Sequence, residues 1–122
     1  MKKILIIDDH MDTVDYIADT LEHNYEILTA YDGAQGLEQV KKNQPDLILL
    51  DLIMHIVDGY QFMDQLQNEK ISIPIIVVTG APKHKLEKLA DYKVNDVVYK
   101  PFTEDVFLKK IDLVLKMATG ER

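Results

Sequence analysis

Five short apolar runs alternate along the chain with longer stretches in which apolar residues recur every three or four positions. The runs lie at 4–7, 27–30, 47–50, 75–78 and 97–99, and most of them are rich in Ile and Val. Their length and composition predict β-strands. The helical spacing of the stretch after each run predicts a helix there, so the pattern is one of five strand–helix pairs.

This strict alternation predicts parallel strands joined by right-handed crossovers, with helices covering both faces of one sheet. The continuous apolar runs at 4–7, 47–50 and 75–78 suit central strands, whereas Glu26 and Asp96 place polar groups on the other two, as edge strands tolerate. The predicted fold is α/β: a flavodoxin-like, doubly wound parallel sheet of order 2-1-3-4-5, with five helices on two faces. Because no linker, repeat or low-complexity tract interrupts the pattern, we expect residues 1–122 to form one domain.

Two helix boundaries follow from polar residues near the apolar stripes. Asp12 or Thr13 is the expected N-cap of the first helix. The fourth helix is predicted only from Leu86, Leu89 and Ala90 within a highly charged segment.

Polar side chains stand where four of the predicted strands end. They are Asp8 and Asp9 after the first strand, Asp51 after the third, Thr79 at the fourth and Lys100 after the fifth. The carboxyl ends of parallel strands meet at one edge of the sheet, so these groups are expected to lie close together. Two carboxylates about 4 Å apart repel by about 4 kcal/mol at an effective dielectric of about 20. Three such acids must raise a pKa, recruit a cation, or do both.

This set of groups suits phosphoryl chemistry assisted by a metal ion. Carboxylates with free coordination positions suit Mg²⁺, which often binds one or two carboxylates together with a phosphate. A carboxylate can accept a phosphoryl group as a nucleophile, and a metal, a lysine and a hydroxyl can neutralise the phosphoryl oxygens. Of the four histidines, only His10 is close enough to the acid pair to contribute to a softer metal site, which is the alternative to an all-oxygen Mg²⁺ site.

Four segments carry a resemblance to a known family. They read IIDD at 6–9, LLDLIMHIVDG at 49–59, VVTGA at 77–81 and YKPF at 99–102. With these motifs the chain resembles the receiver domain of two-component response regulators over nearly all of its 122 residues. The resemblance implies a role for each matching residue: Asp51 as the phosphoacceptor; Asp8, Asp9, Asp51 and the backbone carbonyl of Ile53 as Mg²⁺ ligands; Thr79 and Lys100 as the groups that bind the phosphoryl oxygens; and a cis bond between Lys100 and Pro101.

Several positions depart from the pattern of that family. His55 stands where Pro is usual, Gly80 replaces a common Ala, and Lys93 stands where a Gly commonly ends the fourth helix. Val97 occupies the place of the aromatic switch residue. Tyr99, two residues on and on the same strand face, is the candidate substitute.

The resemblance implies a signalling function rather than a turnover enzyme. A sensor histidine kinase or a phosphotransfer protein would donate the phosphoryl group, and phosphorylation would switch a partner-binding surface. A phosphatase with an aspartyl nucleophile, like the haloacid dehalogenases, needs an acid where this chain has Ile53. A flavin-binding flavodoxin needs a phosphate-cradling loop where Asp8 and Asp9 would repel the phosphate.

The last helix carries two apolar stripes. Phe107, Leu108, Ile111, Val114 and Leu115 form the stripe expected to face the sheet, and Val106, Leu113 and Met117 form a second one. We call Val106, Leu113 and Met117 the outer stripe. It is either incidental exposure or a surface for a partner or a homodimer.

Composition and charge exclude several further functions and kinds of site. The net charge of −7 argues against binding to a nucleic-acid backbone, and the absence of cysteine excludes disulfides and thiolate metal sites. Without a signal peptide or an apolar stretch of about 18 residues, the expectation is a cytoplasmic protein that does not enter a membrane. Whether it stands alone or is the amino-terminal part of a longer regulator is left open by the sequence.

Overall fold

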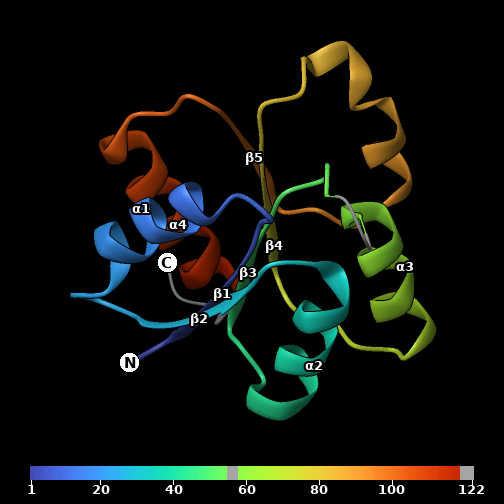
Figure 1. Ribbon diagram of the computed structural model, residues 1–122, viewed down its shortest axis with the longest axis horizontal. Helices are drawn as coiled ribbons and strands as arrows, with labels where there is room; N and C mark the ends of the chain where they lie inside the picture. The colour runs from blue at the N-terminus through green and yellow to red at the C-terminus, as the bar shows by residue number, and fades with distance from the viewer. Residues whose placement is uncertain (55–57, 119–122) are drawn as a thin grey trace.

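The computed structural model describes residues 1–54 and 58–118. The described chain forms one parallel sheet between two layers of helices (Figure 1). In chain order the elements are β1 (Lys3–Ile7), α1 (Met11–Leu21), β2 (Glu26–Ala30), α2 (Gly33–Asn43), β3 (Leu47–Leu50), α3 (Gly59–Asn68), β4 (Ile75–Thr79), the 3₁₀ helices η1 (Lys83–Lys85) and η2 (Glu87–Asp91), β5 (Asp96–Tyr99) and α4 (Glu104–Ala118).

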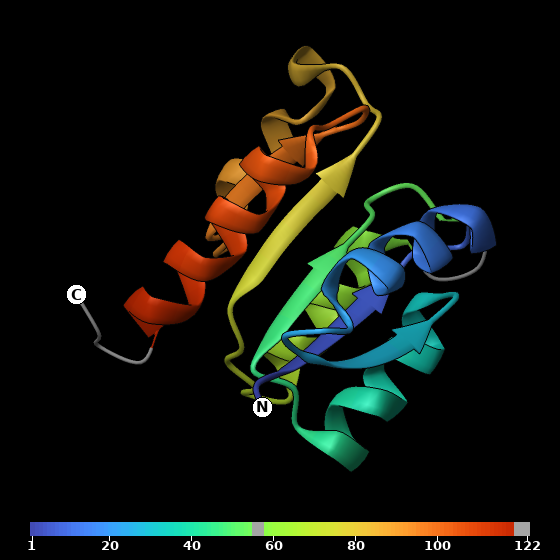
Figure 2. The ribbon, with the colours of Figure 1, turned by 90° about the vertical axis from the view of Figure 1, so that its left-hand side faces the viewer.

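The sheet has the predicted strand order, β2-β1-β3-β4-β5, and every pair of neighbours is parallel. The common direction of the strands is visible in Figure 2. Every residue of β3 and β4 is buried, whereas β2 and β5 each contain exposed and half-buried positions. The prediction of central and edge strands is therefore confirmed. The central strands are buried because helices cover them on both faces of the sheet.

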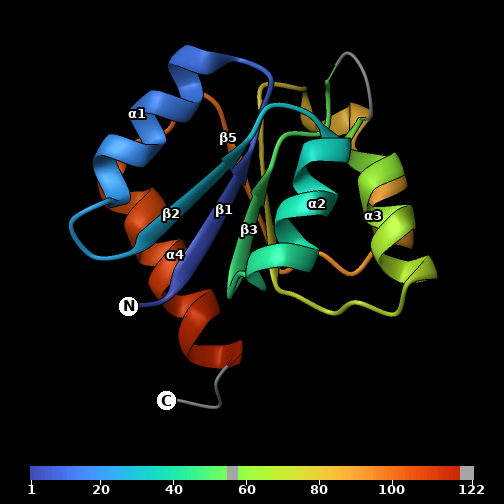
Figure 3. The ribbon, with the colours of Figure 1, turned by 60° about the horizontal axis from the view of Figure 1, so that its bottom comes forward.

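The two helix layers cover opposite faces of the sheet. In Figures 1 and 3, α1 and α4 lie on one side of the strands, and α2 and α3 lie on the other. Successive side chains of a strand point to opposite faces, so Ile4 and Ile6 of β1 pack with α1 and α4. Leu5 and Ile7 of the same strand join the cluster on the side of α2 and α3.

The prediction of a fourth α-helix is wrong. Between β4 and β5 the described chain forms only η1 and η2, so the fold has four α-helices rather than five over residues 1–54 and 58–118. Leu86, at the junction of the two turns, has φ −104° and ψ 17°, which is outside the helical region, and neither turn has a side-chain cap. Leu86 and Leu89 are three residues apart, a spacing that suits the three residues per turn of a 3₁₀ helix.

The N-terminus of α1 differs from the prediction, and that of α3 has a capping interaction that was not predicted from the sequence. His10, not Asp12 or Thr13, is the N-cap residue of α1, and its side chain makes no capping hydrogen bond. At α3 the side chain of Asp58 accepts a hydrogen bond from the backbone nitrogen of Gln61, and the Gln61 side chain accepts one from the Asp58 backbone. This reciprocal pair fixes where α3 begins, directly after the segment that contains His55, which lies outside the described residues.

The two stripes of α4 are placed as predicted. Phe107, Ile111, Val114 and Leu115 are buried, and Leu108 is half-buried against the same core cluster. The outer stripe is exposed, with 49% of Val106, 57% of Leu113 and 71% of Met117 accessible. Among the described residues, no helix is long and apolar enough to cross a membrane.

Candidate functional site

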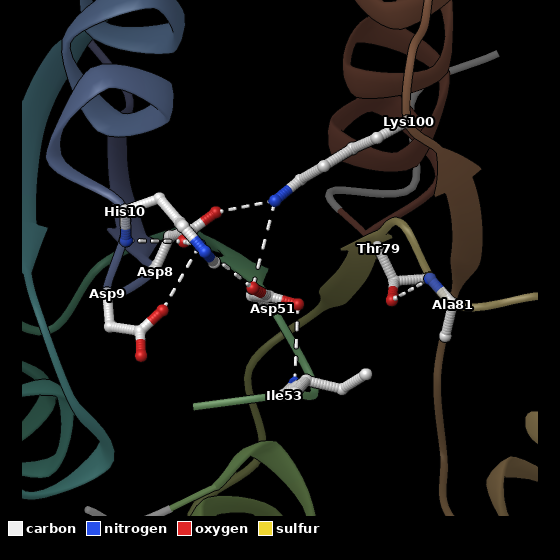
Figure 4. A network of polar contacts seen from close by, with 8 residues as sticks. All are labelled: Asp8, Asp9, His10, Asp51, Ile53, Thr79, Ala81 and Lys100. Atoms are coloured by element: carbon white, nitrogen blue, oxygen red, sulfur yellow. Dashed lines mark hydrogen bonds and ion pairs between the residues drawn. The ribbon is translucent and has the colours of Figure 1, made fainter. Parts of the chain in front are cut away.

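The carboxyl ends of β1, β3, β4 and β5 bring the predicted polar residues together at one edge of the sheet. Figure 4 shows Asp8, Asp9, Asp51, Thr79 and Lys100 converging there. Asp8, Asp51 and Thr79 are buried, with exposed fractions of 2%, 4% and 0%. The convergence expected from the strand ends is thus present in the structure.

Backbone hydrogen bonds hold these residues in line with the sheet even where the strands have formally ended. The nitrogen of Asp51 donates to the carbonyl of Ile7 at 2.9 Å, and the nitrogen of Lys100 donates to the carbonyl of Thr79 at 2.8 Å. The nitrogen of Asp8 likewise donates to the carbonyl of Ala30 at 3.1 Å. The sheet therefore fixes the positions from which the side chains project.

Lys100 lies between two of the buried carboxylates. Its Nζ is 2.8 Å from Oδ2 of Asp8 and 3.7 Å from Oδ2 of Asp51. The ammonium group therefore neutralises part of the negative charge that the strand ends bring together. Its peptide bond to Pro101 is cis, as the resemblance implied.

His10 approaches the same carboxylates from the start of α1. Its Nδ1 is 2.9 Å from Oδ1 of Asp8, 3.1 Å from Oδ1 of Asp9 and 3.9 Å from Oδ2 of Asp51. The hydrogen bond and the charge of Asp8 raise the pKa of the His10 imidazole. The sequence indicated proximity to the acids but not that the ring would turn over all three.

The Asp51 carboxyl is an acid in an unfavourable environment. Burial is the largest effect on its pKa and raises it, and the charge of Asp8 raises it further. Lys100, His10 and a 3.3 Å hydrogen bond from the backbone nitrogen of Ile53 oppose that shift without cancelling it. The folded chain therefore holds a proton on Asp51 more tightly than the unfolded chain does.

This pKa shift predicts that Asp51→Asn stabilises the metal-free protein at neutral pH. Because the folded pKa is raised, ionised Asp51 destabilises the fold, and this cost grows as pH rises from the ordinary Asp value, about 3.9, through the folded value. We expect a gain in unfolding free energy of about 0.5–2 kcal/mol at pH 7, the usual range for a single stabilising substitution. The gain should disappear below about pH 3.9.

Urea unfolding with a chelator present, at neutral and at acidic pH, measures this difference. Asp15→Asn is the matched control, since Asp15 is an exposed carboxylate in the middle of α1. Loss of stability at pH 7 in Asp51→Asn would contradict the assignment of Asp51 as an acid in an unfavourable environment.

Thr79 and Ile53 lie at the same edge of the sheet as Asp51 (Figure 4). The Thr79 hydroxyl is buried and accepts a hydrogen bond from the backbone nitrogen of Ala81 at 3.1 Å. The side chain of Ile53 is 62% exposed, and its backbone lies against Asp51 through the hydrogen bond described above. A cavity of about 470 Å³ beside them is lined by Asp51, Ile53, His10 and Lys100.

The two candidate switch residues of β5 differ in exposure. Val97 is half-buried and packs against the core on the side of α2 and α3. Tyr99 is 41% exposed and pairs with Thr79 in the register of β4 and β5. The structure therefore places an aromatic ring at the surface next to the strand that carries the buried hydroxyl.

The acids and His10 together form a group that could hold a metal ion. Asp8, Asp9, His10 and Asp51 each offer one ligand atom, and these atoms all lie within 4.8 Å of one another. The geometry therefore accommodates a cation at the position expected from the sequence.

Comparison with known proteins decides the family. The family model for the response regulator receiver domain matches residues 4–112. The chain belongs to this family. Among curated relatives of this receiver domain, the response regulator ArlR of Staphylococcus saprophyticus is 37% identical over 119 residues, which are 95% of this chain and 53% of the relative. The alkaline phosphatase synthesis transcriptional regulatory protein PhoP of Bacillus subtilis is 30% identical over 118 residues, 94% of this chain and 49% of the relative.

Solved receiver structures have the same fold. A CheY-like receiver domain protein from Methanospirillum hungatei superposes with a TM-score of 0.90 at 24% identity, covering 98% of each chain. The N-terminal domain of a response regulator/sensory box/GGDEF three-domain protein from Carboxydothermus hydrogenoformans superposes with a TM-score of 0.87 at 28% identity, again with 98% of each chain covered. The chain spans about half the length, or less, of the curated relatives it matches.

Proposed function

We propose that residues 1–122 form a receiver domain that accepts a phosphoryl group on Asp51 from a sensor histidine kinase or a phosphotransfer protein, and that the modification switches its affinity for a partner. The observation that carries this proposal is the position of Asp51, a buried carboxylate facing a cavity of about 470 Å³ with Lys100 3.7 Å away. The domain is not a turnover enzyme in this proposal, because it is itself the acceptor.

The transfer is a displacement at phosphorus. An oxygen of Asp51 forms the new bond while the bond from phosphorus to the donor's nitrogen breaks, and the electron pair of that bond leaves with the nitrogen. Lys100 can pair with the added charge because its ammonium group already reaches the Asp51 carboxylate. The Thr79 hydroxyl would rotate away from its bond with the Ala81 nitrogen and donate to a phosphoryl oxygen.

The acid set fits the Mg²⁺ ion that membership of the receiver family implies. Asp8, Asp9, Asp51 and the backbone carbonyl of Ile53 would hold the ion, because oxygens of the three carboxylates lie within 4.8 Å of one another and all four groups offer hard oxygen ligands. When bound, Mg²⁺ would supply positive charge to the phosphoryl oxygens.

The proposed function is tested by incubating the protein with acetyl phosphate, a small phosphoryl donor, and recording intact mass. We expect one phosphoryl group per chain in the presence of Mg²⁺ and essentially none after chelation. A chain that gains no phosphoryl group from acetyl phosphate or from any phosphorylated histidine donor would contradict the function.

Mg²⁺ is expected to stabilise the fold because it relieves the repulsion among the carboxylates. At about ten times its dissociation constant it should add about 1.4 kcal/mol to the free energy of unfolding. Urea titration with and without Mg²⁺ measures the gain. Asp9→Asn should lose most of it and Asp15→Asn should retain it, whereas an equal gain in both variants would place the ion elsewhere.

The outer stripe of α4 is the surface we propose for the output. Tyr99 is exposed on β5, the strand that lies next to α4 and pairs with β4, which carries Thr79. Because Val97 is too small to act as the switch aromatic, Tyr99 or the loop after Thr79 would carry the change toward the outer stripe. The coupling would amount to about 1–3 kcal/mol.

We expect phosphorylation to promote association through the outer stripe, either with a partner or in a two-fold homodimer. For a homodimer, sedimentation of the protein with a beryllofluoride mimic of the phosphoryl group should show a dimer that is absent without the mimic and that Leu113→Lys abolishes; for a partner, a pull-down with and without the mimic should show the same dependence. Asp112→Lys, also on the exposed side of α4, is the matched control. Activated association that survives Leu113→Lys would move the output surface away from α4.

A further inference from the structure

His10 occupies a helix-capping position without acting as a cap. N-cap residues usually accept a hydrogen bond from the first turn of the helix through a short polar side chain. The His10 side chain makes no such bond, and its ring turns back over the carboxylates instead. The backbone nitrogen of His10 donates to Oδ1 of Asp8 at 2.9 Å, which holds the residue in that orientation.

The His10 ring makes a hydrogen bond and ion-pair contacts with the acids, and the same distances also fit ligand atoms that share one metal ion. Ligand atoms about 2.1 Å from an octahedral ion are separated by about 3 Å at adjacent corners and about 4 Å at opposite ones. Nδ1 lies 2.9 Å from an oxygen of Asp8, 3.1 Å from one of Asp9 and 3.9 Å from one of Asp51. One nitrogen and three oxygens from separate side chains thus lie within 4.8 Å of one another, and Figure 4 shows the contacts of His10 with Asp8, Asp9 and Asp51.

A nitrogen in this position changes which ions the site prefers. Mg²⁺ is satisfied by oxygen ligands and gains little from an imidazole, whereas first-row transition metals bind imidazole well. The affinity of a mixed nitrogen and oxygen site for divalent ions also rises along that row from Mn²⁺ to Cu²⁺.

We propose that His10 is a metal ligand through Nδ1 and that it makes this receiver site select a divalent transition metal ion over Mg²⁺. The inference rests on the metal site of the proposed function and adds to it the residue that sets the choice of ion. A transition metal ion would gain a fourth protein side-chain ligand in His10, whereas Mg²⁺ would gain little from the ring.

Isothermal titration with Co²⁺ and with Mg²⁺, at about pH 8 where protons compete least, tests the selectivity. His10→Gln should weaken Co²⁺ binding tenfold or more and leave Mg²⁺ binding unchanged or tighter. His23→Gln is the matched control, because His23 lies beyond the other end of α1. If His10→Gln weakens Co²⁺ and Mg²⁺ binding equally, His10 positions the carboxylates rather than binding the ion, and the proposal is overturned.

Pulsed electron paramagnetic resonance of the Mn²⁺-loaded protein detects the bond itself. Modulation from a directly bound ¹⁴N nucleus should be present in the wild type and in His23→Gln, and absent in His10→Gln. A wild-type spectrum without nitrogen modulation would overturn the role of His10 even if Mg²⁺ still supported phosphorylation of the wild type. If the wild type accepts no phosphoryl group with any metal ion, the result contradicts the proposed function instead.

Discussion

Asp51→Asn is expected to abolish phosphorylation by acetyl phosphate. An amide oxygen is a far weaker nucleophile than a carboxylate oxygen, and the substitution would remove the buried carboxylate that faces the donor from the end of β3. Intact-mass measurement over a time course should show a loss of at least about 100-fold in the rate of labelling. The variant should still fold, because removing this charge relieves an unfavourable burial.

The control for this result must remove an acid without touching the site. Asp15→Asn removes an exposed carboxylate from α1 and should be labelled like the wild type. Full labelling of Asp51→Asn at one position would transfer the acceptor role to another side chain, which peptide mapping would identify.

Gly59→Ala is expected to destabilise the fold more than Asp9→Asn or Leu113→Lys. A Cβ atom at this position would lie 2.7 Å from Cα of Leu52 and 2.8 Å from the carbonyl oxygen of Asp51. Both are backbone atoms, and the nitrogen of Gly59 donates to the carbonyl of Leu52 at 3.0 Å, so α3 or the segment after β3 must move. Overpacking of this kind costs about 3 kcal/mol.

The same substitution at Gly80 provides the comparison. A Cβ atom there meets nothing within 4 Å, and the backbone is outside the left-handed region. Gly80→Ala should therefore change stability by less than about 1 kcal/mol, with a gain from reduced freedom of the unfolded chain. Urea midpoints measured side by side test the pair, and equal midpoints would mean that α3 does not pack against the chain after Asp51 as described.

The sequence was sufficient to predict the sheet and the acid set. Apolar runs of strand length define central strands such as β3, and the rule that carboxyl ends of parallel strands share an edge brings Asp8, Asp51 and Thr79 together. These inferences succeed because burial on both faces leaves a strong pattern in the residues themselves.

The features that the sequence did not predict depend on local geometry or on distant contacts. Leu86 and Leu89 are three residues apart, a spacing that fits a 3₁₀ turn as well as an α-helix. The spacing alone therefore could not show that this segment forms 3₁₀ turns. The direction of the His10 ring depends on acids that meet only once the sheet has formed. The requirement for Gly59 likewise arises from the close approach of α3 to Leu52.

The replacement of a helix by η1 and η2 has an energetic consequence for the region between β4 and β5. Its turns are held by backbone hydrogen bonds that each span three residues, such as Leu86 to Lys83 and Tyr92 to Leu89. Of the residues in this region, Leu86 is the one large side chain buried in the core. Few buried contacts and short-range bonds make local opening cheaper than global unfolding. We therefore expect amide protons of this region, next to Thr79, to exchange faster than those of the central strands.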